Sequence, residues 1–361
     1  MSLLTNYINS IPDNVQTGEI ICTLDSTVPI GYLRCDGSVV SQSTYSELYS
    51  KVGLIPTGLL DWSSQDTKLF SDVFAVAYGA GTYVAGGTNG YLSTSTDGIN
   101  WTQRFTTGNI IYDIVYANNI FTSVANNGTV STSTNGITWT SRTSGTTNSL
   151  RSLIYGNNLY VYSGLSGRIA TSTDSITWTV RTSGTTQPIN ALAYGNGIYV
   201  YVGGLGVIST STDGITWTAR TSGTTVTLNT ITYGNNLFVA GGNSFTLLTS
   251  TDGITWDTQD YPGVLLTNSI ANINSIIYDG NIFLSSTSAN IGPISKDGTT
   301  WEPQELLSTT VYRLAYLNNS YFGAGSSRRV HYTNKYTYNS ATEFVLPKPS
   351  TSNYLNFYIK T

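Results

Sequence analysis

Carboxylates recur at a fixed place in a repeated ten-residue segment of this sequence, of which STSTDGITWT, residues 209–218, is a representative copy. The repeated carboxylates are Asp97, Asp174, Asp213, Asp252 and Asp297, and Asn135 takes the same place in one copy. Hydrolysis of a glycoside needs two carboxyl groups that converge on one bond. Because successive copies lie about 39 residues apart, we expect these carboxylates to be spread over separate structural repeats and not to form a catalytic pair.

The segment STDGITW is similar to the Asp-box of sialidases and related propellers, with one residue fewer between the aspartate and the glycine. An aspartate at this position can accept hydrogen bonds from the backbone N–H groups of its own turn. The tryptophan starts the next strand and can pack between repeats. We therefore predict a structural role for Trp62, Trp101, Trp139, Trp178, Trp217, Trp256, Trp301, Asp97, Asp174, Asp213, Asp252 and Asp297.

Charged residues are scarce on the strands expected to be innermost. The Asp-box resemblance would require a cluster of arginines, a tyrosine nucleophile and acids there, but these strands offer Asp113, Arg151, Arg313 and little else. That set is too small for acid–base or nucleophilic catalysis. The sequence shows no glycine-rich phosphate loop, Ser–His–Asp set or metal-ligand spacing. We therefore predict no enzyme, no cofactor and no metal site.

The composition argues against further classes of function. Only 10% of the 361 residues are charged, the formal net charge is −4 and no basic run occurs, so we expect no nucleic-acid partner. No apolar run approaches the roughly 20 residues of a membrane-spanning helix, so we expect no membrane insertion. The lone histidine, His331, is not expected to be catalytic, and whether Cys22 and Cys35 are bonded stays open.

The period of the repeats predicts the architecture. Seven tryptophans are spaced 39, 38, 39, 39, 39 and 45 residues apart, and a tyrosine recurs with a similar period from Tyr78 to Tyr316. Within residues 190–222, four strand-like segments, NALAY, IYVYVGG, GVISTST and ITWTARTS, are separated by turns. Four short antiparallel strands in roughly 40 residues are typical of a β-propeller blade. The period therefore predicts seven blades.

Trp62 has the right spacing but no repeat in front of it, whereas the seventh repeat, which begins at Val311, lacks its tryptophan. An exposed strand edge has to be paired or protected. We therefore expect the segment from Asp61 to Asp66 to supply the outer strand of the last blade. This pairing would close the ring and bring its two ends together.

Residues 17–53 are expected to form short strands near residues 19–24 and 32–35 and a helix over residues 42–52. This segment resembles the bacteriophage tail-collar domain, and the resemblance is carried by Gly18, Ile20, Gly31, Tyr32, Leu33, Cys35, Asp36, Gly37, Ser38, Val40, Ser41, Tyr45, Leu48 and Gly53. Phe344, Leu346 and Pro347 match the first half of a later F-x-L-P-D-x-R-G tract, whose second half does not match. The ending NYLNFYIKT is similar to the terminal strand of many phage fibre and tail proteins.

These observations predict a mainly β protein, a seven-bladed β-propeller with four-stranded antiparallel blades inserted into a small α+β collar-like domain. We expect an N-terminal arm over residues 1–16 and a discontinuous, anchoring collar-like domain over residues 17–58 plus 342–361. The propeller is expected over residues 59–341, closed by the strand around Trp62.

The resemblance implies a phage virion protein of a tail or fibre tip, assembled in the host cytoplasm with other tail, baseplate or fibre proteins. It also implies a homotrimer, although a chain without a fibre shaft could instead cap another protein. We expect the propeller to bind a host surface glycan or protein. Two alternatives are a structural protein whose propeller docks onto another virion subunit, and a glycan hydrolase.

Binding is expected where the repeats differ, in loops that open toward one face of the ring. The connection between Trp256 and Tyr278 carries six extra residues, and one loop of the last repeat carries two adjacent arginines. The receptor-binding candidates are Tyr261, Leu265, Leu266, Arg328 and Arg329. Surface variation without function is the competing interpretation.

Overall fold

The computed structural model of the protein describes residues 20–23, 32–34, 39–41, 63–67, 72–106, 108–259, 271–288, 291–302, 310–334, 343–345 and 356–360. The chain divides into two compact units, Met1–Asp61 with Asn334–Thr361, and Trp62–Thr333. The arm expected over residues 1–16, the helix expected over residues 42–52, Cys35 and Trp62 lie outside the described residues. In the part that is described, no helix has the length and apolar character needed to cross a membrane.

The smaller unit is built from both ends of the chain. Its three-stranded sheet has the order β1 (Ile20–Thr23), β33 (Asn356–Lys360), β2 (Tyr32–Arg34), with antiparallel neighbours. A second antiparallel pair joins β3 (Val39–Ser41) to β32 (Glu343–Val345). Each sheet therefore pairs a segment that precedes the larger unit with one that follows it.

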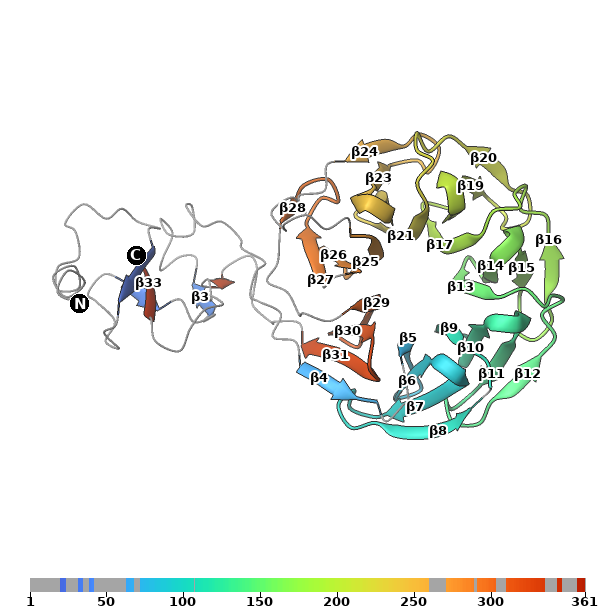
Figure 1. The fold of residues 1–361 in the computed structure, drawn as a ribbon, viewed down its shortest axis with the longest axis horizontal. Helices are drawn as coiled ribbons and strands as arrows, with labels where there is room; N and C mark the ends of the chain where they lie inside the picture. The colour runs from blue at the N-terminus through green and yellow to red at the C-terminus, as the bar shows by residue number, and fades with distance from the viewer. Residues whose placement is uncertain are drawn as a thin grey trace. The chain divides into compact units, whose positions relative to one another are not determined.

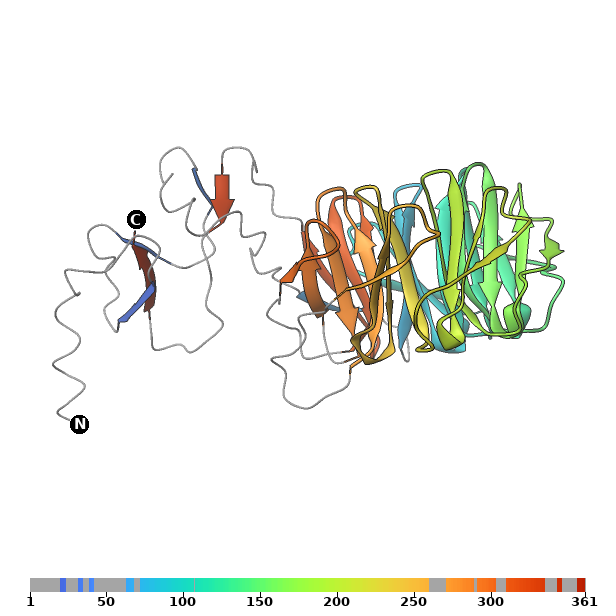
Figure 2. The ribbon, with the colours of Figure 1, turned by 90° about the horizontal axis from the view of Figure 1, so that it is seen from above.

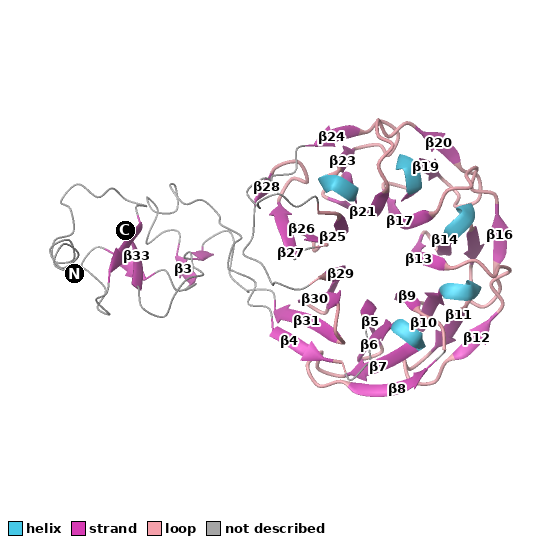
Figure 3. Cartoon of the chain, viewed as in Figure 1, coloured by secondary structure: helices cyan, strands magenta, loops and turns pink. Residues whose placement is uncertain are grey.

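The larger unit contains seven four-stranded antiparallel sheets that succeed one another around a ring (Figure 1). Viewed edge-on, the strands run between the two faces of this ring (Figure 2). The predicted architecture of seven blades with four antiparallel strands each is confirmed. Short 3-10 turns, drawn as helices in Figure 3, join the second and third strands of the first five blades, and they are η1 (Thr88–Gly90), η2 (Asn126–Gly128), η3 (Leu165–Gly167), η4 (Gly204–Gly206) and η5 (Asn243–Phe245).

The first six blades are each continuous in sequence and run from the innermost to the outermost strand. Blades 1 to 3 contain β5 (Val73–Gly79), β6 (Thr82–Gly87), β7 (Tyr91–Ser95) and β8 (Thr102–Thr106); β9 (Ile111–Ala117), β10 (Ile120–Ala125), β11 (Val130–Ser133) and β12 (Thr140–Arg142); β13 (Leu150–Gly156), β14 (Leu159–Gly164), β15 (Ile169–Ser172) and β16 (Thr179–Arg181). Blades 4 to 6 contain β17 (Ile189–Gly195), β18 (Ile198–Gly203), β19 (Ile208–Ser211) and β20 (Thr218–Arg220); β21 (Leu228–Gly234), β22 (Leu237–Gly242), β23 (Leu247–Ser250) and β24 (Asp257–Gln259); β25 (Ile273–Tyr278), β26 (Phe283–Thr287), β27 (Ile291–Ser295) and β28 (Trp301–Glu302).

The seventh blade takes its outermost strand from the other end of the propeller sequence. It consists of β29 (Val311–Leu317), β30 (Ser320–Gly325), β31 (Arg329–Asn334) and β4 (Ser63–Asp66). In the β31–β4 pair, Arg329 lies opposite Asp66, and its side chain donates a 2.9 Å hydrogen bond from Nη1 to Ser64 Oγ. Pairing β4 with β31 completes the last blade and closes the ring.

The repeated aspartate binds its own turn. In blade 4, Asp213 Oδ1 accepts hydrogen bonds from the backbone N–H groups of Ile215 and Thr216 and from Ser211 Oγ, each at 2.8 Å. The bond from the Thr216 N–H is the main cause that lowers the pKa of Asp213 to about 2. The indole of Trp217 closes the same turn, because its Nε1 donates to the carbonyl oxygen of Gly214 at 3.3 Å. The carboxylate is thus engaged locally, which supports the structural interpretation of the repeat.

Contact between blades depends on a glycine at the end of several innermost strands. A Cβ atom on Gly195 of β17 would lie 2.0 Å from Cγ of Tyr233, which belongs to β21 in the next blade. Equivalent approaches join Gly156 to Tyr194 and Gly234 to Tyr278. The recurrent tyrosine therefore packs its ring directly on the backbone of the preceding blade.

Replacing Gly195 with alanine is expected to destabilise the propeller by about 1–3 kcal/mol, because the added methyl group overpacks the contact with the Tyr233 ring. The measurement is chemical unfolding followed by tryptophan fluorescence, which reports on the propeller because all seven tryptophans belong to that unit. In the double variant Gly195→Ala/Tyr233→Ala, the two losses should be less than additive, since the clash is relieved. Unchanged stability in Gly195→Ala would contradict the close packing.

Candidate binding site at the channel mouth

One residue from each blade lies around the mouth of the central channel, on the face where the innermost strands begin. It is the second residue of each innermost strand and stands four positions before the recurrent tyrosine. These seven residues, called here the mouth ring, are Phe74, Tyr112, Arg151, Asn190, Asn229, Asn274 and Tyr312. All seven line a single cavity of about 370 Å³.

A β-bulge in every blade places the mouth ring. In blade 3, Leu150 pairs with Gly164 and Ser152 pairs with Ser163, so Arg151 between them has no partner on β14. The same shift of register occurs in the other six innermost strands. Bulges of this kind re-aim a side chain next to a functional site. The residue before each bulge is fully buried in the core, so the backbone around the mouth is firmly held.

One side of the mouth ring is aromatic. The ring of Phe74 lies 5.0 Å from that of Tyr312 and 5.8 Å from that of Tyr112, measured between centroids. The guanidinium carbon of Arg151 lies 4.7 Å from the Tyr112 centroid, which is a cation–π arrangement. Tyr312 donates a 3.2 Å hydrogen bond from its hydroxyl to Asp72 Oδ2, and burial raises the pKa of this phenol.

The other side of the mouth ring consists of amides. Each asparagine donates from Nδ2 to a backbone carbonyl of the next blade: Asn190 to Leu228, Asn229 to Ile273 and Asn274 to Val311, at 2.9, 3.1 and 3.1 Å. These bonds hold the side chains and leave each Oδ1 atom as an acceptor. In the part of the chain that the structure describes, none of the three Oδ1 atoms accepts a hydrogen bond.

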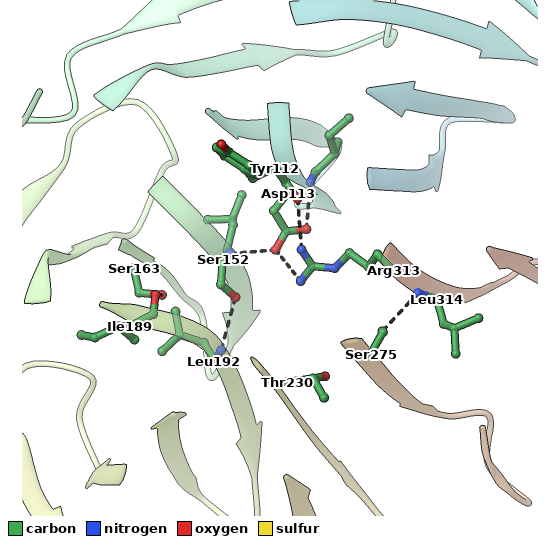
Figure 4. Close-up of polar contacts among 12 residues, drawn as sticks. Tyr112, Asp113, Ser152, Ser163, Ile189, Leu192, Thr230, Ser275, Arg313 and Leu314 are labelled. Atoms are coloured by element: carbon green, nitrogen blue, oxygen red, sulfur yellow. Dashed lines mark hydrogen bonds and ion pairs between the residues drawn. The ribbon is translucent and has the colours of Figure 1, made fainter. Parts of the chain in front are cut away.

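A layer of polar contacts lies one residue further along the innermost strands (Figure 4). Arg313 forms an ion pair with Asp113, with 2.9 Å between Nη2 and Oδ2, and its Nη1 donates to the backbone oxygen of Tyr112 at 3.1 Å. Asp113 also accepts the N–H groups of Ile114 and Leu153 at 2.9 and 2.8 Å. Burial raises the pKa of Asp113, and the Arg313 charge opposes that effect. This carboxylate is occupied on both oxygens and is poorly placed to exchange protons with a ligand.

Side-chain hydroxyls continue this layer around the channel. Ser152, Thr230 and Ser275 accept the backbone N–H groups of Leu192, Ile276 and Leu314 at 3.2, 3.1 and 3.1 Å, each from the next blade. Figure 4 shows two of these bonds beside the ion pair. The layer joins neighbouring blades and supports the mouth ring from below.

The structure places the predicted binding residues differently from the mouth ring. Arg328 and Arg329 are exposed, and neither is among the described residues that line the cavity. The Arg328 carbonyl accepts the backbone N–H of Thr67 at 3.0 Å. Tyr261, Leu265 and Leu266 lie outside the described residues, in the connection that leads from β24 into β25.

Sequence reasoning identified Asp113, Arg151 and Arg313 on the innermost strands but missed the other six residues of the mouth ring. A signal was present, because a polar or aromatic residue stands four positions before the tyrosine in all seven repeats. In a regular strand, side chains alternate between the two faces of the sheet, and this alternation alone does not direct the residue toward the channel. The bulge that does so depends on the pairing with the neighbouring strand. Within the described residues, no group of three or more His, Cys, Asp or Glu side chains could hold a metal ion.

Family models match one segment in each of the two parts of the chain. Residues 18–55 match the Phage Tail Collar Domain, which confirms the resemblance seen in the sequence, and residues 142–274 match the DUF6242 beta propeller domain. The collar match suggests a phage tail protein and thus a virion component. No curated protein matches the chain.

Solved structures similar to the chain share its propeller fold. YCF48 bound to D1 peptide is 15% identical with a TM-score of 0.63, over 76% of this chain and 94% of that one. YCF48 from Cyanidioschyzon merolae is 15% identical with a TM-score of 0.61, over 76% and 98%. Virginiamycin B lyase from Staphylococcus aureus is 11% identical with a TM-score of 0.65, over 76% and 99%. At these identities the similarity shows the fold alone.

Proposed function

We propose that this chain is a non-enzymatic receptor-binding protein of a phage tail, attached through its collar-like domain and binding the host cell surface through the mouth ring. The collar match supports the place in the virion. The observation that carries the binding role is that all seven blades turn a bulge residue into one cavity, with aromatic rings on one side and amide acceptors on the other. Cavities of this size lined by a few polar groups are typical of ligand sites.

The proposed binding surface also includes loops at the face of the ring that carries the channel mouth. The turn after β30 contains Ser327, whose N–H donates to Asp72 Oδ1 at 3.0 Å, and the other oxygen of Asp72 accepts the Tyr312 hydroxyl. The turn that carries Arg328 is thereby joined to the mouth ring through two hydrogen bonds. The connection with six extra residues leads into β25, whose second residue is Asn274. We therefore keep Tyr261, Leu265, Leu266, Arg328 and Arg329 as further proposed receptor-binding residues.

A non-catalytic role is supported by the cavity lining, which among the described residues contains two arginines and no carboxylate. The nearby Asp113 is held by two backbone N–H groups and by Arg313. Glycoside hydrolysis requires two carboxyl groups on either side of the scissile bond. The likeness to virginiamycin B lyase concerns the fold and brings no catalytic residue to this site.

Labelled full-length protein is expected to bind susceptible host cells and to block adsorption of the phage. Phe74→Ala and Asn190→Ala should each weaken this binding by about tenfold or more, because each removes one side of the cavity. A matched control is Ile215→Ser, which changes an exposed side chain in a turn at the opposite face. Thermal unfolding checks that the variants fold. Equal binding by both mouth variants and the control would refute the assignment of the mouth ring.

A specific observation also favours the alternative of docking onto another virion subunit. Five successive blades expose an isoleucine at the same place in the turn between the third and fourth strands, with exposed fractions of 41–47%; they are Ile99, Ile137, Ile176, Ile215 and Ile254. These residues lie at the face opposite to the mouth ring. If this face docks onto the virion, Ile137→Ser/Ile215→Ser will reduce incorporation into particles while cell binding by the free chain is unchanged.

A further inference from the structure

We propose that the mouth ring binds a carboxylated sugar at the end of a host surface polysaccharide, with Arg151 as the residue that pairs with the carboxylate. The inference rests on the proposed receptor-binding function and specifies the chemistry of its ligand. It depends on three properties of the cavity, which are an unpaired cation, an aromatic surface and a wall of acceptors.

The cation is Arg151. Its Nε atom is buried without a hydrogen-bond partner, and its guanidinium group has no acidic partner among the described residues. Arg313 pairs with Asp113, and Arg220 donates from Nε to Thr210 Oγ1 at 2.9 Å. Arg168 Nε is also buried without a hydrogen-bond partner, but Arg168 is not among the residues that line this cavity. A partly buried guanidinium without a partner is costly, and a carboxylate satisfies it with two parallel hydrogen bonds. The free charge at the mouth therefore favours an anionic ligand.

The aromatic surface lies next to this cation. Tyr112 stacks against Arg151, and the tilted rings of Phe74 and Tyr312 extend the surface away from it. Aromatic rings offer apolar area with a defined geometry at low conformational cost. The C–H face of a sugar ring is apolar and flat enough to lie on such a surface, while its carboxylate reaches Arg151.

The amide side of the cavity favours a sugar over a peptide. Asn190, Asn229 and Asn274 each bind the next blade through Nδ2 and keep an Oδ1 acceptor. Asn229 uses its second amide hydrogen on Asn243, whereas Asn190 and Asn274 each keep one amide hydrogen as a donor. This side therefore offers three acceptors and two donors. Sugar hydroxyls both donate and accept, so a polyhydroxylated acid can use both kinds of group.

Residues from all seven blades surround this cavity. Its volume of about 370 Å³ is at the lower end of the range for small-molecule sites. Thr230, Ser275 and Arg313 of the next layer also line it, and Arg313 is held by its ion pair with Asp113. A site of this size that is surrounded on every side suits one sugar at the end of a chain better than the middle of a long polysaccharide, so we assign it to a terminal sugar.

The test uses the full chain and calorimetric titration with an oligosaccharide that ends in glucuronic acid, compared with the same oligosaccharide ending in glucose. We expect the acidic probe to bind about tenfold or more tightly, because two parallel hydrogen bonds between a guanidinium and a carboxylate are stronger than a neutral bond to a hydroxyl. Arg151→Gln should abolish this preference, whereas Arg151→Lys should retain part of it. Binding of the acidic probe should weaken as the salt concentration rises.

The matched control is Arg220→Gln, because Gln259 occupies the equivalent position in blade 5 and donates to Thr249 at 2.9 Å in the same way. This variant should keep the preference for the acidic probe. Equal affinity for both probes, or an unchanged preference in Arg151→Gln, would overturn the inference. Tighter binding of a peptide with a free C-terminal carboxylate than of its amidated form, without binding of the acidic sugar, would also overturn it. Binding of host cells without binding of the acidic probe would leave the receptor function standing and reject only this ligand.

Discussion

Asp113→Ala is expected to lower the free energy of unfolding of the propeller by about 2–5 kcal/mol, since each buried N–H group left without an acceptor costs about 1–3 kcal/mol. Asp113 is only 5% exposed, and its carboxylate accepts the N–H groups of Ile114 and Leu153 and pairs with Arg313, whose side chain is 33% exposed. Alanine leaves those two N–H groups without acceptors and removes the counter-charge of Arg313. Urea unfolding followed by tryptophan fluorescence measures the loss.

The matched control is Asp213→Asn, which changes a carboxylate that binds only its own turn. Asn135 already takes the equivalent place in blade 2, where its Oδ1 accepts the N–H groups of Ile137 and Thr138 at 2.9 Å. We expect this exposed substitution to change stability by less than about 1 kcal/mol.

A double-mutant cycle that combines Asp113→Ala with Arg313→Ala should give a coupling energy of at least ~1 kcal/mol. Losses of equal size for Asp113→Ala and Asp213→Asn would contradict a special role for the buried pair.

Acidification is expected to destabilise the closing blade between about pH 6.5 and pH 4. His331 of β31 is buried, and burial, assisted by the nearby Arg329 charge, lowers its pKa to about 4 from an ordinary value near 6.5. In this window the unfolded chain binds a proton that the folded chain does not, so stability falls as the pH falls. The full loss is about 3 kcal/mol and is complete below the folded-state pKa.

The sequence makes this prediction easy to isolate, since His331 is its only histidine. Hydrogen bonds lower the pKa values of turn aspartates such as Asp213 and Asp297 to about 2 in the folded protein. The stability that these carboxylates contribute is therefore lost only when the pH falls below about 4. Asp113, whose pKa is raised by burial, contributes a dependence of the opposite sign. The contribution of the histidine is therefore the difference between the wild type and His331→Gln in the unfolding free energies measured at pH 7, 6 and 5. His331→Gln should flatten the dependence over this range, and an unaltered slope in that variant would show that other groups cause it.

The fold could be predicted from the sequence because its information is repeated. Six of the seven repeats contain the turn motif and its tryptophan, so six copies of one weak pattern give a strong prediction of four-stranded blades. The collar resemblance depended on a dense set of matches over residues 18–55, which the family comparison confirms. Local patterns were sufficient in both cases.

The candidate site was harder to predict because it arises from a relation between strands. A bulge shifts the register between neighbouring strands, and no particular residue type in the innermost strand predicts that shift. Phe74, Arg151 and Asn190 have little in common as residues, yet the bulge directs all three into one cavity. A comparison of the repeats position by position shows a polar or aromatic residue four positions before each recurrent tyrosine. That comparison would have indicated the mouth ring, whereas a search for differences in the loops does not.

The strand that closes the ring has a consequence for synthesis of the protein on the ribosome. Ser64 of β4 and its partner Arg329 are 265 residues apart. At about 5–20 residues per second, β4 waits on the order of tens of seconds before its partner emerges. An unpaired strand invites aggregation during that delay. The sequence of β4, Ser-Ser-Gln-Asp, is wholly polar. The propeller strand that waits longest for its partner therefore has no apolar side chain with which to aggregate.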